Sequence, residues 1–186
     1  MKASNAAACR VPCVAQYLAL CREHFWRNWK AYTFPLAAVF VLQLFVRLDI
    51  NVTQSLPDHV FLTVKGWKAD IRRGDYIAFR WQGGGPFPKG FHFVKIVAGI
   101  PGDVISVDEA RGFWRRAADD SVTGQFLGMA KTHSLKGEPL ATGPVGTIPP
   151  GYYYVMAPHK DSLDSRYALT GWVREEAIIG KCFALF

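Results

Sequence analysis

Cysteine is scarce in this chain of 186 residues, which has four, and only Cys182 lies after residue 50. A single thiol excludes a disulfide within the long C-terminal part, which must therefore depend on a packed core. The other cysteines lie near the N-terminus. Cys9 and Cys13, in "CRVPC", have a loose spacing for metal ligands and no second pair. We expect inert thiols there and no metal site.

The chain also lacks a dense basic stripe with interleaved aromatic residues, which argues against a nucleic-acid partner. Its formal charge is +7, of which residues 1–30 carry +4 and the remainder only +3. This asymmetry points to membrane topology instead. Internal repeats and low-complexity tracts are absent and half of the residues are apolar, so we expect one domain, or one domain with an appendage.

Only one long apolar run is present, "AYTFPLAAVFVLQLFV" at 31–46, and its 16 residues fall short of the roughly 20 that a straight span needs. Arg47 can extend the run by snorkelling, and Trp26 and Trp29 suit an interfacial belt. We predict a cytoplasmic segment at residues 1–30 and an uncleaved transmembrane anchor at 31–50. A translocated domain follows at 51–186. The alternatives are a buried core helix and a cleavable signal peptide, and the long N-terminal region disfavours the latter.

Short β-branched or aromatic runs, broken by Gly and Pro, follow from residue 59 onward. No long helical period occurs after residue 50. We therefore predict a mostly β fold, a coiled and partly closed antiparallel sheet tethered by one N-terminal transmembrane helix. The strands are predicted near 59–64, 75–81, 91–98, 103–108, 122–130, 151–157 and 172–185.

Lys95 lies within "FHFVKIVAGIPGD" (91–103), a predicted strand in which alternate residues share a face. That alternation places Phe93 and Val97 on the same side as Lys95. Burial in such an apolar wall would lower the pKa of the lysine and make it a candidate general base. The alternative is an ordinary lysine whose stem covers apolar surface.

Ser55 lies in "NVTQSLPDHVF" (51–61), directly after the apolar run. Ser55 is either a simple turn residue or a nucleophile. A serine hydroxyl becomes a nucleophile when a base such as a neutral lysine removes its proton. The amide of Ser55 and the hydroxyl of Thr53 are candidate oxyanion donors, and Pro57 favours a sharp turn.

A polar segment, "HKDSLDSRYALTG" (159–171), completes the candidate site. In a functional interpretation Ser162 contacts the Lys95 amine, while Asp164 and Arg166 brace the loop as an ion pair. The alternative is a polar turn after a strand.

Four segments in this order, "SLP", "RRGDYIAF" (72–79), "VKIVAGIPGD" (94–103) and "DSLDSRY" (161–167), resemble the successive motifs of the type I signal peptidases. The resemblance covers roughly residues 51–185. The TraF-type conjugative-transfer peptidases are most similar, because they share "N-x-T-x-S-x-P" and a short approach to "DSRY". Two departures are His59, where these relatives usually have glycine, and Ala168-Leu169 after "DSRY".

This resemblance implies a membrane-anchored serine endopeptidase with a mostly β fold, at the bacterial inner membrane with its active site on the periplasmic side. The implied partner is a membrane-bound precursor, either a pilin that is trimmed and in some cases cyclised or a general preprotein. No metal or organic cofactor is implied. The resemblance implies Ser55 as nucleophile, Lys95 as general base and Thr53 as oxyanion donor. It implies Ser162 as the residue that orients the lysine, and Asp164 with Arg166 as a supporting pair.

Other readings of the same residues remain open. Ser55, Asp58 and His59 could form a serine-histidine-aspartate relay, although no G-x-S-x-G elbow is present. Asp161 and Asp164 could share a proton as a carboxylate pair. A non-enzymatic alternative is a membrane-tethered β scaffold in a pilus or secretion machine.

Overall fold

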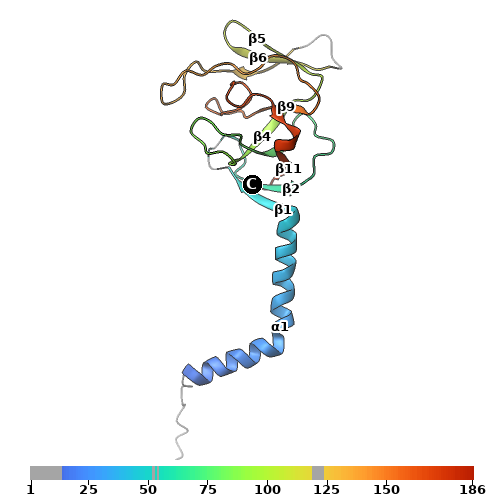
Figure 1. Ribbon diagram of the computed structural model, residues 1–186, viewed down its shortest axis with the longest axis vertical. Helices are drawn as coiled ribbons and strands as arrows, with labels where there is room; N and C mark the ends of the chain where they lie inside the picture. The colour runs from blue at the N-terminus through green and yellow to red at the C-terminus, as the bar shows by residue number, and fades with distance from the viewer. Residues whose placement is uncertain (1–13, 52, 54, 119–123) are drawn as a thin grey trace, which may run out of the picture. The chain divides into compact units, whose positions relative to one another are not determined.

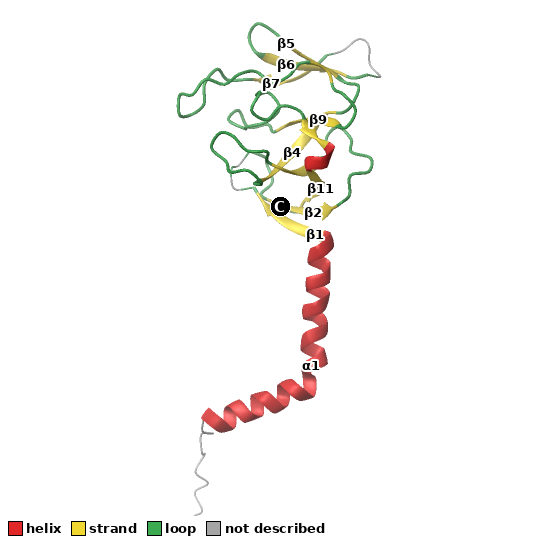
Figure 2. Ribbon diagram, viewed as in Figure 1, coloured by secondary structure: helices red, strands yellow, loops and turns green. Residues whose placement is uncertain are grey.

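The computed structural model describes residues 14–51, 53, 55–118 and 124–186, and they form two compact units, 1–43 and 44–186. Figures 1 and 2 show a helix in the first unit and β-strands in the second. Cys9 and Cys13 lie outside the described residues, as do the first thirteen residues of the predicted cytoplasmic segment.

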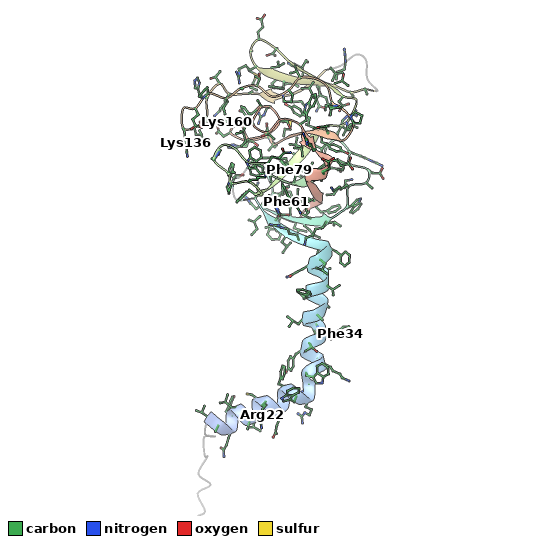
Figure 3. The ribbon with its side chains drawn as sticks, in the orientation of Figure 1. Arg22, Phe34, Phe61, Phe79, Lys136 and Lys160 are labelled. Atoms are coloured by element: carbon green, nitrogen blue, oxygen red, sulfur yellow. The ribbon has the colours of Figure 1, made fainter. Side chains whose placement is uncertain are left out.

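The described part of the first unit is helical and belongs to α1, Val14–Phe45, whose last two residues are counted in the second unit. Asn28 leaves helical geometry at φ −113° and ψ 15°, and its side-chain amide donates to the His24 carbonyl at 2.9 Å. This local break accounts for the bend in α1 seen in Figure 1. No described residue of α1 is buried, and Figure 3 shows Arg22 and Phe34 projecting from it.

The predicted transmembrane anchor at 31–50 is not supported. Within the described parts of the chain, no helix combines the length and apolarity that crossing a membrane requires. The physical reason lies at its C-terminal end: Arg47 was expected to extend the short apolar run by snorkelling, but residues 46–50 form a β-strand that pairs with the next one.

The second unit contains two antiparallel sheets. The seven-stranded sheet has the order β1-β2-β11-β3-β4-β9-β10, and the four-stranded sheet has the order β7-β6-β5-β8. The first sheet contains β1 Val46–Ile50, β2 Val60–Lys65, β3 Tyr76–Arg80, β4 His92–Gly99, β9 Tyr152–Met156, β10 Val173–Arg174 and β11 Ile178–Ala184. The second contains β5 Val104–Val107, β6 Gly112–Arg116, β7 Gln125–Met129 and β8 Gly146–Thr147.

The mostly β prediction is confirmed, because every predicted strand segment contains an observed strand. The predicted segment 172–185 is interrupted by a 3₁₀ turn at Glu175–Ala177, which separates β10 from β11. The segment 122–130 begins at two residues outside the described part of the chain. Strands β1, β6 and β8 were not predicted.

The cores of the domain lie on and between these sheets. One cluster packs against the face of β3 and β4 that carries Phe79 and Phe93. A second joins Tyr154 of the large sheet to Ile105 and Phe113 of the small sheet. Because this second cluster contains residues from both sheets, it fixes the small sheet against the ends of β4 and β9.

Candidate active site

Strand β4 places Lys95 on its buried face. The strand alternates between partly buried and buried residues, as the sequence predicted, and Lys95 pairs across the sheet with Ile77 of β3. Only 4% of its surface is exposed, and its amine lies 5.8 Å from the centre of the Phe93 ring. Burial lowers the pKa of Lys95 to about 8, while Asp164 acts to raise it and Arg166 to lower it.

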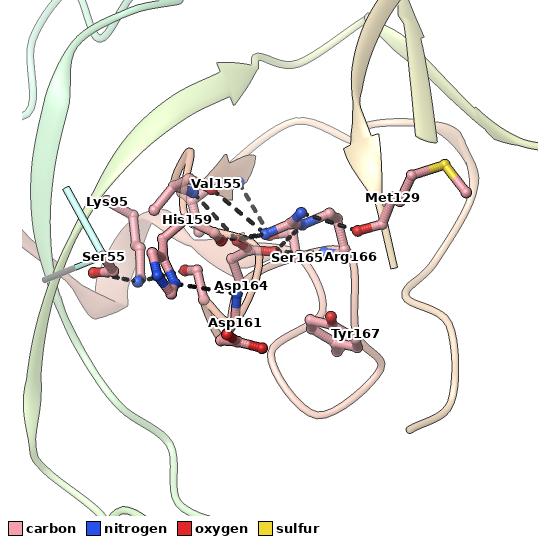
Figure 4. Close-up of polar contacts among 12 residues, drawn as sticks. Ser55, Lys95, Met129, Val155, His159, Asp161, Asp164, Ser165, Arg166 and Tyr167 are labelled. Atoms are coloured by element: carbon pink, nitrogen blue, oxygen red, sulfur yellow. Dashed lines mark hydrogen bonds and ion pairs between the residues drawn. The ribbon is translucent and has the colours of Figure 1, made fainter. Parts of the chain in front are cut away.

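Ser55 lies in the connection between β1 and β2 and is also buried. The Lys95 amine donates to the Ser55 hydroxyl at 3.1 Å, a contact drawn in Figure 4. The two side chains are therefore in direct hydrogen-bond contact in a site from which water is largely excluded.

The Ser55 turn is held by Asn51. The Asn51 side-chain oxygen lies 3.4 Å from the Ser55 hydroxyl and 3.2 Å from that of Thr53. Its amide group donates to the carbonyls of Leu56 and Asp58, at 3.4 and 3.3 Å. Asn51 was expected only as part of a motif, and this positioning role was not predicted, although its place four residues before the serine was a signal for it.

Thr53 contacts the nucleophile candidate directly. Its hydroxyl oxygen is 3.2 Å from the Ser55 hydroxyl, and its side chain is exposed. The hydroxyl is therefore near the place where an oxyanion would form on a bound carbonyl, although here its proton has two competing acceptors within the protein.

Ser162 provides the second hydrogen bond to Lys95. The amine donates to the Ser162 hydroxyl at 2.8 Å, and Ser162 is buried. Two acceptors fix the direction of the amine, which limits its rotation and aims it at Ser55.

Asp164 and Arg166, two and four residues after Ser162, form a buried ion pair. The Arg166 Nε and Nη2 atoms donate to the two oxygens of Asp164, each at 2.8 Å. The Asp164 carboxylate also accepts from the Ala157 amide at 3.2 Å, and Arg166 Nη1 donates to the Met129 carbonyl at 3.0 Å. Figure 4 shows this network extending from the loop to β7.

The chain matches the family model described as "Signal peptidase, peptidase S26" over residues 30–186. The chain belongs to the signal peptidase family. No curated protein matches it. As a member of this family, the chain is a serine peptidase whose substrate is a preprotein, and its antiparallel β domain is consistent with that assignment.

The other readings of the residues do not agree with the geometry of this signal peptidase. His59 is exposed, and the neighbouring Asp58 accepts from the Tyr76 hydroxyl at 3.3 Å. Asp161 pairs with Lys131, and Asp164 pairs with Arg166. Among the described residues, no group of histidine, cysteine and acidic side chains is arranged to hold a metal ion.

Proposed function

We propose that this signal peptidase cleaves a membrane-bound precursor with Ser55 as nucleophile and Lys95 as general base. The observation that carries the proposal is the buried hydrogen-bond chain from Ser55 through the Lys95 amine to Ser162, at 3.1 and 2.8 Å. A buried lysine with a lowered pKa is able to exist as the neutral amine that the reaction needs.

Acylation begins when neutral Lys95 takes the Ser55 proton as the serine oxygen attacks the scissile carbonyl. The developing oxyanion accepts hydrogen bonds from the Ser55 amide and from the Thr53 hydroxyl, which rotates away from Asn51 to do so. The Lys95 ammonium then returns its proton to the departing amine as the C–N bond breaks, which leaves an ester on Ser55.

Deacylation repeats these steps with a second nucleophile. Water loses a proton to Lys95 and attacks the ester, and Ser55 regains its proton as the acid product leaves. An amine of the same polypeptide in place of water would form a peptide bond and join the ends of the substrate.

We propose a pilin precursor of conjugative transfer as the substrate, with a general secretory preprotein as the competing substrate. The "N-x-T-x-S-x-P" pattern of Asn51, Thr53, Ser55 and Pro57 supports the first. Both classes are expected to have small residues before the scissile bond, so the product, linear or circular, is more informative than the cleavage motif.

We place the chain at the bacterial inner membrane with its β domain on the periplasmic side. The support is the exposed apolar surface of α1, which includes Phe34 and Phe40, and the excess of basic residues in the N-terminal thirty. Recovery of the full chain in a soluble fraction after cell lysis would contradict this location.

The test uses the full chain with Ser55→Ala and Lys95→Ala. Each variant is expected to lose cleavage of a pilin precursor or a secretory preprotein by about 1,000-fold or more, because each removes one half of the reacting pair. Mass spectrometry of the products identifies the cleavage site and any circular product.

Two matched variants control for the chemical change itself. Ser106 and Lys136 are exposed and lie in the small sheet and in a loop outside the site, so Ser106→Ala and Lys136→Ala should retain full activity. Circular dichroism must show the same fold in all four variants. Cleavage by both Ser55→Ala and Lys95→Ala at the wild-type rate would rule out the proposed pair.

A further inference from the structure

The position of the Ser162 hydroxyl depends on a short turn, residues 159–162. Within it, the Ser162 amide donates to the His159 carbonyl at 3.0 Å, and the Asp161 amide donates to the His159 Nδ1 atom at 3.2 Å. Asp161 thus lies beside Ser162 in a hydrogen-bonded turn. A contact that holds the Asp161 side chain in place therefore also restricts the position of Ser162.

Asp161 is tied to a segment from a different sheet. Its carboxylate forms an ion pair with Lys131, two residues after the end of β7. The Lys131 amide donates to the Tyr167 hydroxyl at 3.1 Å, and the neighbouring Met129 carbonyl accepts from Arg166 at 3.0 Å. Both ends of the ion pair are therefore anchored by contacts other than the pair itself.

This ion pair differs from an ordinary surface pair because both of its residues are held by other contacts. Exposed pairs contribute little to stability, because two mobile side chains lose entropy when they meet. The Lys131 and Asp161 side chains are only partly exposed, at 38% and 21%, and their backbones are fixed on either side of the loop. The contact is better placed to fix local geometry than to stabilise the whole domain.

We propose that Lys131 is a positioning residue that acts through Asp161 to hold the Ser162 hydroxyl against the amine of Lys95. This inference rests on the proposed function for its consequence in catalysis, because Ser162 matters there only if Lys95 is the base. The small sheet thereby takes part in the reaction without contributing a group that touches the substrate.

Two single variants, Lys131→Met and Asp161→Asn, distinguish positioning from a through-space charge effect. If the pair positions Ser162, either change loosens the turn, admits water to Lys95 and raises its pKa toward the ordinary lysine value. The acid limb of kcat/KM then moves to higher pH in both variants, and kcat falls about tenfold with KM nearly unchanged.

A through-space effect predicts opposite shifts. Lys131→Met leaves an extra negative charge and would raise the pKa of Lys95, whereas Asp161→Asn leaves an extra positive charge and would lower it. The charged groups that act on the pKa of Lys95, Asp164 and Arg166, are unchanged in both variants. Shifts of opposite sign would therefore overturn the positioning role, as would unchanged profiles.

A conservative substitution and the loss of a different ion pair serve as controls. Lys131→Arg keeps the cation and should restore activity and profile to within about twofold of the wild type. Lys181→Met removes a comparable ion pair, with Asp75 at 2.8 Å, from strand β11 of the large sheet. It should leave the acid limb in place, because the charged groups that shift the Lys95 pKa are Asp164 and Arg166. A Lys131→Arg variant as impaired as Lys131→Met would contradict the proposal.

The Lys95 pKa is also measured without any substrate, by NMR titration of the full chain with isotope-labelled lysine. A pKa that rises in both single variants supports positioning even if wild-type protein cleaves no precursor, in which case only the proposed function fails. Cleavage by wild-type protein together with an unchanged Lys95 pKa in both variants leaves the proposed function standing and refutes positioning.

Discussion

At the scale of the residue, the property that matters most is the state of the Lys95 amine. An unperturbed lysine has fewer than about one neutral amine in a thousand at pH 7. Burial lowers the pKa of Lys95 to about 8, and Asp164, which acts to raise it, is paired with Arg166, which acts to lower it. At that pKa about one molecule in ten has a neutral amine at pH 7.

This shift predicts the acid side of the pH profile. The competent amine is the deprotonated one, so kcat/KM should fall about tenfold for each pH unit below an apparent pKa near 8. Initial rates between pH 5 and pH 9.5 on one precursor measure it, with circular dichroism at each pH as the control for unfolding. A rate that stays constant down to pH 5 is incompatible with a lysine base of this kind.

At the scale of the element, the strands differ in how much of their structure is visible in the sequence. Strand β4 was predictable because it is a run of aromatic and β-branched residues, and its burial alternates with a period of two from His92 to Val97. The sequence predicts residues 46–50 as the end of the anchor, because Arg47 can snorkel, yet they form strand β1. Nothing local to Asp49 indicates that it will be buried and accept from Thr63 of β2 at 2.6 Å.

The contacts within the site are likewise not visible in the local sequence. Ser55 and Ser162 lie 40 and 67 residues from Lys95. Their chemistry suggested that the three meet, and the order of the family motifs strengthened that prediction, but no local pattern places them together. The ion pair of Lys131 with Asp161 has no such motif and spans 30 residues. It was not predicted, because it depends on how the two sheets pack.

The loop that carries Ser162 should depend strongly on Arg166. Arg166→Met removes the partner of a fully buried carboxylate, Asp164, and should lower the free energy of unfolding by about 3 kcal/mol. Urea denaturation of the full chain at pH 7 measures the loss. Arg166→Lys should recover only part of it, since an ammonium does not reproduce the two-point contact of a guanidinium. A loss below about 1 kcal/mol for Arg166→Met would show that the loop is held by other contacts.

At the scale of the whole β domain, the two sheets are joined by Arg73 and Asp103. Arg73 precedes β3 in the large sheet, and Asp103 precedes β5 in the small one. Arg73 donates to both oxygens of Asp103, at 2.8 and 2.5 Å, and the amides of Ile100 and Ala118 donate to the same carboxylate. Asp103 is fully buried, so these donors replace the water that the carboxylate loses on folding.

The pair predicts a pH-dependent stability. Burial acts to raise the pKa of Asp103, but the hydrogen bonds from Arg73 and Ile100 outweigh it and hold the pKa below its ordinary value. A carboxyl group with a lowered pKa stabilises the fold above its unfolded pKa, and that contribution disappears as the pH falls through the folded value. Asp103 should therefore stabilise the domain at neutral pH and cease to do so in strong acid.

Arg73→Met tests this linkage between the sheets. At pH 7 it leaves the Asp103 carboxylate without its cation, and the free energy of unfolding should fall by about 2–3 kcal/mol. At pH 4 the difference from the wild type should be smaller, because the buried carboxyl of the variant accepts a proton and no longer needs a partner. The double variant Arg73→Met/Asp103→Asn should be more stable at pH 7 than Arg73→Met alone, since no charge is left unpaired. Urea denaturation at the two pH values measures these free energies of unfolding. If Arg73→Met lowers the free energy of unfolding equally at pH 4 and pH 7, the contact between the sheets depends on packing and not on this charge.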